Sequence, residues 1–119
     1  MAVKNVLERY KSVDAANASS QIISPVTTIK FLDNILFELL FSGSPAGSFY
    51  IEVSNDYNPI TNTPGTWIPL DFQASDVLVT GAIDIMAEVN QSPAPYIRVR
   101  WEPTSGTGAL TVWVSAKEV

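Results

Sequence analysis

Hydrophobic and polar residues alternate along most of the chain from about residue 21 onward. The segment "FYIEVSND" at residues 49–56 has this period-two pattern, which is typical of a strand with one buried face. Its predicted buried residues are Phe49, Ile51 and Val53, and its predicted exposed residues are Tyr50 and Glu52.

Similar short runs recur between clusters of Gly, Pro, Asn and Ser. They occupy residues 27–32, 35–41, 66–72, 77–89, 95–102 and 109–117. The run at 35–41 is apolar on both faces and predicts a central strand, whereas residues 82–89 fit either a short helix or a strand, with β-branched residues favouring the strand. About seven or eight short strands at this spacing predict an all-β fold, an antiparallel β-sandwich of jelly-roll-like type.

The first 20 residues differ from the rest of the chain. In "VKNVLERYKSV" the apolar residues have helical spacing, which predicts a short amphipathic helix, and "DAANASS" then resembles a linker. The helix would present Val3, Val6, Leu7 and Tyr10 on one side. We therefore expect an N-terminal arm at residues 1–20 before a β-sandwich domain at residues 21–119. The arm either frays or orders against a neighbouring subunit through Leu7 and Tyr10.

The segment "YIRVRWEPTSGTGALTVWVSAK" at residues 96–117 predicts two strands joined as a hairpin by a Gly-containing turn. Alternation divides the two strands into a core face and an outward face. The predicted core residues are Ile97, Val99, Trp101, Leu110, Val112 and Val114. The predicted outward residues are Tyr96, Arg98, Arg100, Thr111 and Trp113.

The hairpin prediction brings Trp113 to the face that carries Arg98 and Arg100. Three interpretations of this face remain open. The arginines pair within the sheet, including a cation–π contact with the indole; they form a subunit interface, where Tyr, Trp and Arg are enriched; or they bind an anionic ligand.

Composition narrows the classes of function. Apolar residues make up 46% of the 119 residues and charged residues 16%, which excludes a disordered chain. The net charge of −5 argues against non-specific binding to nucleic acid or to an anionic membrane. No apolar run is long enough for a signal peptide or a membrane span, so we expect a soluble protein made in a cytoplasm.

The absence of Cys and His argues against an enzyme, because the commonest nucleophiles, general bases and metal ligands are missing. Carboxylates and amides at Asn55, Asp56, Asn58, Asp71 and Asp76 fit either a calcium or glycosidase site or ordinary turns, and their spacing favours turns. The G-x-G at Gly106 and Gly108 lacks the lysine and the helix of a phosphate-binding loop. We therefore expect no catalytic residues, no metal and no cofactor.

Several motifs taken together resemble a family of small β-sandwich proteins from tailed bacteriophages. They are the strand ending in "SND", the following "W.PLDF", and the final "YIRVRW" and "SGTGAL". The resemblance covers residues 21–117 and implies a virion structural protein.

Within that family the resemblance implies a head decoration, or cement, protein that binds the assembled head and stabilises it. Its expected partners are the major capsid protein and further copies of itself, with a homotrimer as the analogous arrangement, and its location is the virion. The candidate interface residues are Tyr96, Arg98, Arg100, Trp113, Leu7 and Tyr10. The alternative is a tail or fibre component with a carbohydrate-binding module, in which exposed Trp and Tyr stack on sugar rings of a host glycan.

Overall fold

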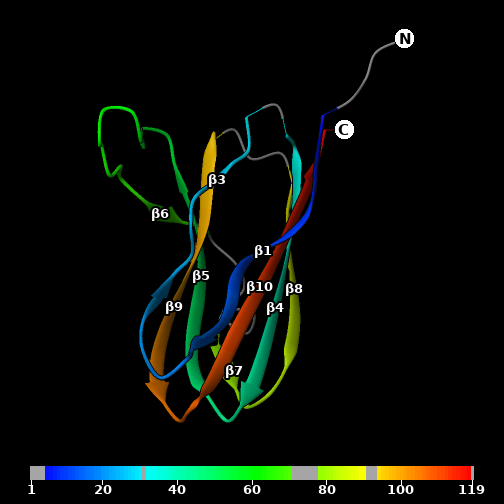
Figure 1. Cartoon of the computed structure of the whole chain (residues 1–119), viewed down its shortest axis with the longest axis vertical. Helices are drawn as coiled ribbons and strands as arrows, with labels where there is room; N and C mark the ends of the chain where they lie inside the picture. Colours follow the sequence, from blue (N-terminus) through cyan, green and yellow to red (C-terminus); the bar gives the residue numbers. More distant parts are fainter. Residues whose placement is uncertain (1–4, 31, 71–77, 91–93, 119) are drawn as a thin grey trace.

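The structure is a computed structural model that describes residues 5–30, 32–70, 78–90 and 94–118. Within these ranges all regular structure is β, and the strands form two antiparallel sheets packed face to face (Figure 1). The predicted all-β sandwich is confirmed.

The first sheet has four strands and the second has six. The four-stranded sheet runs in the order β1 (Val6–Asn17), β10 (Gly108–Lys117), β4 (Asn34–Gly43) and β8 (Asp84–Asn90). The six-stranded sheet contains β2 (Ile22–Ile23), β3 (Thr27–Thr28), β9 (Tyr96–Ser105), β5 (Ala46–Ser54), β6 (Ile68–Pro69) and β7 (Leu78–Thr80). In this second sheet β9 and β5 are the long central strands, while β2, β3, β6 and β7 are short strands along their outer edges.

The core lies between the sheets and is built by the predicted alternation. All six residues predicted for the core face of the 96–117 segment are at most 1% exposed. Trp101 fills the centre, with its ring centroid 4.9 Å from that of Phe41, and its indole Nε1 donates a hydrogen bond to the Ala18 carbonyl at 2.9 Å. The buried polar N–H is thus satisfied, as packing a Trp in a core requires.

The 96–117 segment is not a hairpin. Its two strands belong to different sheets: β9 pairs with β5, whereas β10 pairs with β1 and β4. The chain turns from one sheet to the other at residues 106–107, where Gly106 has φ 79°. The hairpin prediction was therefore wrong, because a Gly-containing turn serves a bend between sheets as well as a turn within one.

Five other connections join strands of different sheets, namely β1 to β2, β3 to β4, β4 to β5, β7 to β8 and β8 to β9. The bend after β4 lies against the bend after β9, with the Ser44 amide donating to the Thr107 carbonyl at 2.8 Å. In the four-stranded sheet, β1, β4 and β8 are each followed by a strand of the opposite layer, and β10 is preceded by one.

The helix predicted in the first 20 residues is also wrong. Residues 6–17 form β1, which pairs with β10 from Val6 opposite Lys117 to Asn17 opposite Ala109. Three register shifts interrupt this pairing, so the side chains of β1 do not alternate strictly. In the structure this part of the predicted arm is an edge strand of the sandwich.

The segment at 77–89 is confirmed as strand over the part that the structure describes, where it contributes β7 and β8. Asp71 and Asp76, two of the carboxylates considered for a metal or hydrolase site, lie outside the described residues.

Candidate interaction surface

One buried carboxylate organises the outer face of the six-stranded sheet. Glu52 on β5 lies opposite Arg98 of β9, and Tyr50 lies opposite Arg100. Glu52 Oε1 accepts a hydrogen bond from Arg98 Nε at 2.9 Å, and its Oε2 accepts one from Arg100 Nε at 2.9 Å. Glu52 was predicted to be exposed, but the two arginine side chains cover it and leave the residue 4% exposed.

A second carboxylate completes the ion pairing at the end of this row. Arg100 Nη1 and Gln21 Nε2 both donate to Glu102 Oε1, each at 2.5 Å. These two hydrogen bonds, that of Arg100 first, hold the pKa of Glu102 below its ordinary value. Burial opposes the charged form of Arg100, but its bonds to Glu102 and Glu52 outweigh this and raise its pKa. Both arginines are thus paired with carboxylates, which favours pairing within the sheet over an anionic ligand.

Aromatic rings pack against both arginines. The Arg98 guanidinium carbon lies 4.1 Å from the Trp67 ring centroid, and that of Arg100 lies 4.3 Å from the Tyr50 ring. Tyr57 connects this row to Tyr96, with centroids 5.8 Å from Trp67 and 5.1 Å from Tyr96. The resulting aromatic row of Tyr57, Trp67 and Tyr96 combines a β9 residue with two loop residues, and alternation along β9 alone gave no signal for those two.

The two loop aromatics are held by a structured connection between β5 and β6, residues 55–67. Asp56 Oδ1 accepts hydrogen bonds from the Thr66 amide at 2.6 Å and from the Ser54 hydroxyl at 3.0 Å. These bonds, the amide of Thr66 first, lower the pKa of Asp56. The carboxylate oxygens therefore close the base of the loop, as the turn interpretation predicts, and no cluster of potential metal ligands occurs among the described residues.

The far end of the 55–67 loop is a small, hydrogen-bonded turn. Asn58 and Thr63 form a β-bridge, and Asn58 Oδ1 accepts the Ile60 amide proton at 2.9 Å. The hydroxyls of Thr61 and Thr63 lie 2.8 Å apart, within hydrogen-bond distance. This ordered turn projects away from the sandwich (Figure 1) and leaves Ile60 at its tip 91% exposed.

Trp113 lies on the other side of the molecule from Arg98 and Arg100. It belongs to β10 and to the outer face of the four-stranded sheet, where β1 supplies its cations. The Arg9 guanidinium carbon is 3.8 Å and Lys11 Nζ is 4.9 Å from its ring centroid. The expectation that Trp113 shares a face with Arg98 and Arg100 is therefore wrong, since it depended on the hairpin.

Leu7 and Tyr10 point toward the core instead of lying on a free helical face. Both are half-buried and pack against the core cluster. The Tyr10 hydroxyl forms a hydrogen bond with the Thr27 hydroxyl of β3, so this side chain joins the two sheets. The four remaining candidates, Tyr96, Arg98, Arg100 and Trp113, are divided between two opposite outer faces.

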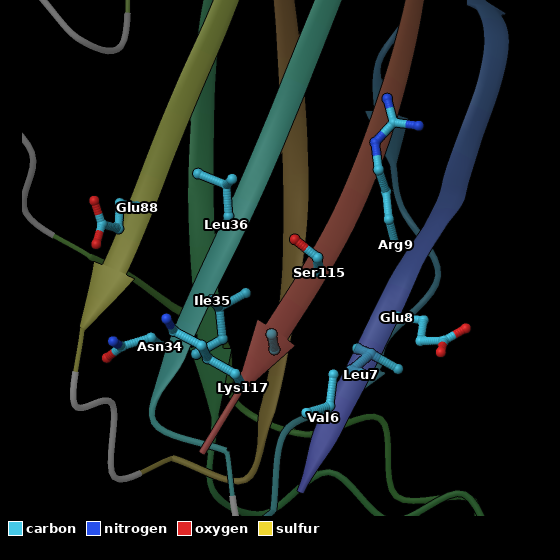
Figure 2. A pocket seen from close by; sticks show the side chains of 11 residues that line it. Val6, Leu7, Glu8, Arg9, Asn34, Ile35, Leu36, Glu88, Ser115 and Lys117 are labelled. Atoms are coloured by element: carbon cyan, nitrogen blue, oxygen red, sulfur yellow. The ribbon is translucent and has the colours of Figure 1, made fainter. Parts of the chain in front are cut away.

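A hollow of about 490 Å³ opens on the outer face of the four-stranded sheet (Figure 2). It lies over Ser115, a small residue on β10 between the larger Trp113 and Lys117, with Leu36 of β4 on one side and β1 on the other. Its lining comprises Val6, Leu7, Glu8, Arg9, Asn34, Ile35, Leu36, Glu88, Ser115, Ala116 and Lys117. The floor of the hollow is largely apolar, whereas charged side chains stand around it.

No protein-family model matches this sequence, and no curated protein matches it as a relative. In the part of the chain that the structure describes, there is no helix with the length and apolar character needed to span a membrane.

Proposed function

We propose that this chain is a structural protein of a tailed-phage virion, namely a head decoration protein that binds the assembled shell through a sheet face. The observation that carries the proposal is the preformed row of arginine, tyrosine and tryptophan across the outer face of the six-stranded sheet. These residue types are enriched at the centres of protein interfaces. Because Glu52 already holds Arg98 and Arg100 in place, little side-chain freedom would be lost on binding.

The strand order offers independent support at the level of architecture. In the four-stranded sheet, β1, β4 and β8 are each followed by a strand of the other sheet and β10 is preceded by one, an arrangement expected of a jelly roll. Jelly rolls are common in capsid and lectin domains, so this order agrees with the sequence resemblance but does not choose between those two roles.

In this proposal the partner is the major capsid protein, and the chain acts as a homo-oligomer, by analogy a trimer. A protein that binds only the assembled shell stabilises that shell by mass action. No catalytic role is assigned, since the chain has no His or Cys and the sheet-face carboxylates Glu52 and Glu102 are paired with arginines.

An averaged image of the intact particle, combined with protein quantification of purified virions, tests this proposal. We expect many copies per particle at fixed positions on the outside of the head. Detection on tails alone, or absence from purified virions, would contradict it.

A carbohydrate-binding module of a tail or fibre is the second candidate, and the aromatic row favours it. Tyr57 and Trp67 stand beside Asp56 and Asn58, which gives stacking rings next to groups that bond hydroxyls. We expect a glycan array to give binding that Trp67→Ala abolishes and that Trp113→Ala, on the opposite face, retains. An array without binding at high protein concentration would remove this candidate.

A further inference from the structure

The tip of the 55–67 loop exposes an apolar side chain on a rigid support. Ile60 is 91% exposed, more than any other large hydrophobic residue identified on the described surface. The bond from the Ile60 amide to Asn58 Oδ1, the Asn58–Thr63 bridge and the base at Asp56 fix the loop without the Ile60 side chain. The loop therefore needs no isoleucine side chain for its own structure, and its rigid support leaves that side chain free to enter an apolar hollow.

The hollow on the four-stranded sheet matches this tip in chemistry. Among its lining residues, Val6 and Leu36 are apolar residues outside the buried core, and Val6 is itself 66% exposed. The charged residues around it are two acids and two bases, Glu8, Glu88, Arg9 and Lys117. A balanced rim of this kind attracts neither an acidic nor a basic ligand, and residues 57–65, "YNPITNTPG", carry no charge at all.

We propose that the Ile60 tip of one copy seats in the hollow of a second copy of this chain. The loop extends from the six-stranded sheet and the hollow opens on the outer face of the four-stranded sheet, so the two lie on opposite sides of the molecule (Figures 1 and 2). A tip therefore reaches the hollow of a neighbour, and each copy donates one tip and accepts another. Contacts of this head-to-tail type close into rings when the rotation between copies completes a circle.

The inference names a contact for the oligomer in the proposed function, and it rests only on the loop and the hollow. It holds whatever surface the protein finally attaches to. Its test uses the purified full-length chain without virions, so its failure leaves the particle image to decide the virion role separately.

Two variants address the two halves of the contact. Ile60→Ser removes the apolar tip, and Ser115→Trp fills the hollow from its floor. We expect each to weaken self-association by at least about tenfold in sedimentation velocity, since one buried isoleucine side chain accounts for a factor of that size. The matched controls are Ile23→Ser, at another exposed isoleucine, and Ser42→Trp, at the end of β4 that lies away from the hollow. Both control variants should associate as the unchanged protein does.

Mixing the two variants separates a contact between tip and hollow from a contact of tip with tip or of hollow with hollow. Ile60→Ser retains an intact hollow and Ser115→Trp retains an intact tip, so one productive contact remains between them. We expect the mixture to form heterodimers and nothing larger, while each variant alone is monomeric. A melting temperature equal to that of the unchanged protein would show that the fold of each variant is intact.

Three results would overturn the inference. The first is an unchanged protein that stays monomeric at every concentration tested. The second is normal self-association of the Ile60→Ser variant. The third is a mixture that shows no association although both variants are folded.

Discussion

Glu52 is the shared ion-pair partner of two arginines on the outer face of the six-stranded sheet. It is nearly fully buried, yet each of its two oxygens accepts a charged hydrogen bond from a different arginine. Burial of a charge is tolerated only with such partners, because desolvation otherwise outweighs any Coulombic gain. Glu102, which accepts a hydrogen bond from Arg100 Nη1, is the second carboxylate of this row.

Glu52→Gln should destabilise the fold by about 2–4 kcal/mol, because it removes the shared partner of two half-buried guanidiniums. Urea denaturation followed by circular dichroism measures the loss. The control, Glu102→Gln, removes a carboxylate at the more exposed end of the row and should cost clearly less than Glu52→Gln, because solvent screens an exposed ion pair. Equal losses for the two variants would contradict the central role of Glu52.

Asp56 makes the stability of the 55–67 loop dependent on acid. Its pKa is held below the ordinary value of 3.8 by bonds from Thr66 and Ser54, so the folded state favours the ionised carboxylate. That stability is present above pH 3.8 and is lost as the pH falls through the lowered folded-state pKa. Asp56→Asn should therefore lower the melting temperature at pH 7 and have little effect once the carboxylate is protonated. A difference between the two proteins that stays constant on acidification would refute this account.

At the scale of elements, the bends between the sheets depend on close approach of two backbones. A Cβ placed on Gly106 would lie 2.0 Å from the Ser44 carbonyl oxygen in the neighbouring bend. Gly106 also has φ 79°, a conformation that favours glycine. The bend after β9 therefore tolerates no side chain at this position.

Gly106→Ala and Gly81→Ala form a matched pair that separates backbone strain from this close approach. Gly81 has φ 86°, but a Cβ there would meet nothing within 4 Å. We expect Gly81→Ala to cost about 1 kcal/mol from strain alone, and Gly106→Ala to cost about 3 kcal/mol or more because the two bends must also separate. Chemical denaturation measures both, and equal costs would show that the bends do not press on each other.

Alternation predicted which residues of β9 and β10 are buried, but not which sheet each strand joins. The six core residues were correct because period two depends only on a strand having one wet and one dry face. The pairing of the strands depends on the path of the connection, and "SGTG" is compatible with a hairpin or with a bend between layers. The partners of Arg98 and Trp113 were missed for this reason.

The misassigned helix has a local physical cause. The register shifts within β1 place Leu7 and Tyr10 on the core side at a spacing of three residues, while Arg9 and Lys11 both reach the outer Trp113. A bulged edge strand therefore imitates the spacing of a helix over one or two turns. Bulges also protect an edge strand from pairing with other chains, which gives the irregularity a use.

On the scale of the whole molecule, β1 covers one edge of the sandwich and contributes to its core. Val13 is 7% exposed, and Leu7 and Tyr10 pack against the core cluster. The last strand, β10, therefore lies between β1 and β4 instead of at an edge.

Deletion of residues 1–17 should abolish cooperative thermal unfolding, or leave the chain insoluble, because it uncovers β10 and part of the core. Differential scanning calorimetry of the soluble fraction gives the result. If residues 1–17 were a detachable arm, their loss would leave the sandwich intact. A truncated chain that melts at the temperature of the full chain would therefore support the arm and contradict the role of β1 in the core.

The hydrogen bonds between residues 5 and 118 make the described chain almost a closed loop. The Asn5 amide donates to Glu118 Oε1 at 3.0 Å, and the Glu118 amide donates to the Asn5 carbonyl at 2.8 Å. A short linker joining these positions would let the chain be reopened elsewhere, for example at residues 81–83, where Gly81 has open space around it. A circular permutant of this kind would keep every strand pair while changing the order in which the strands leave the ribosome, and so would test whether early synthesis of β1 matters for folding.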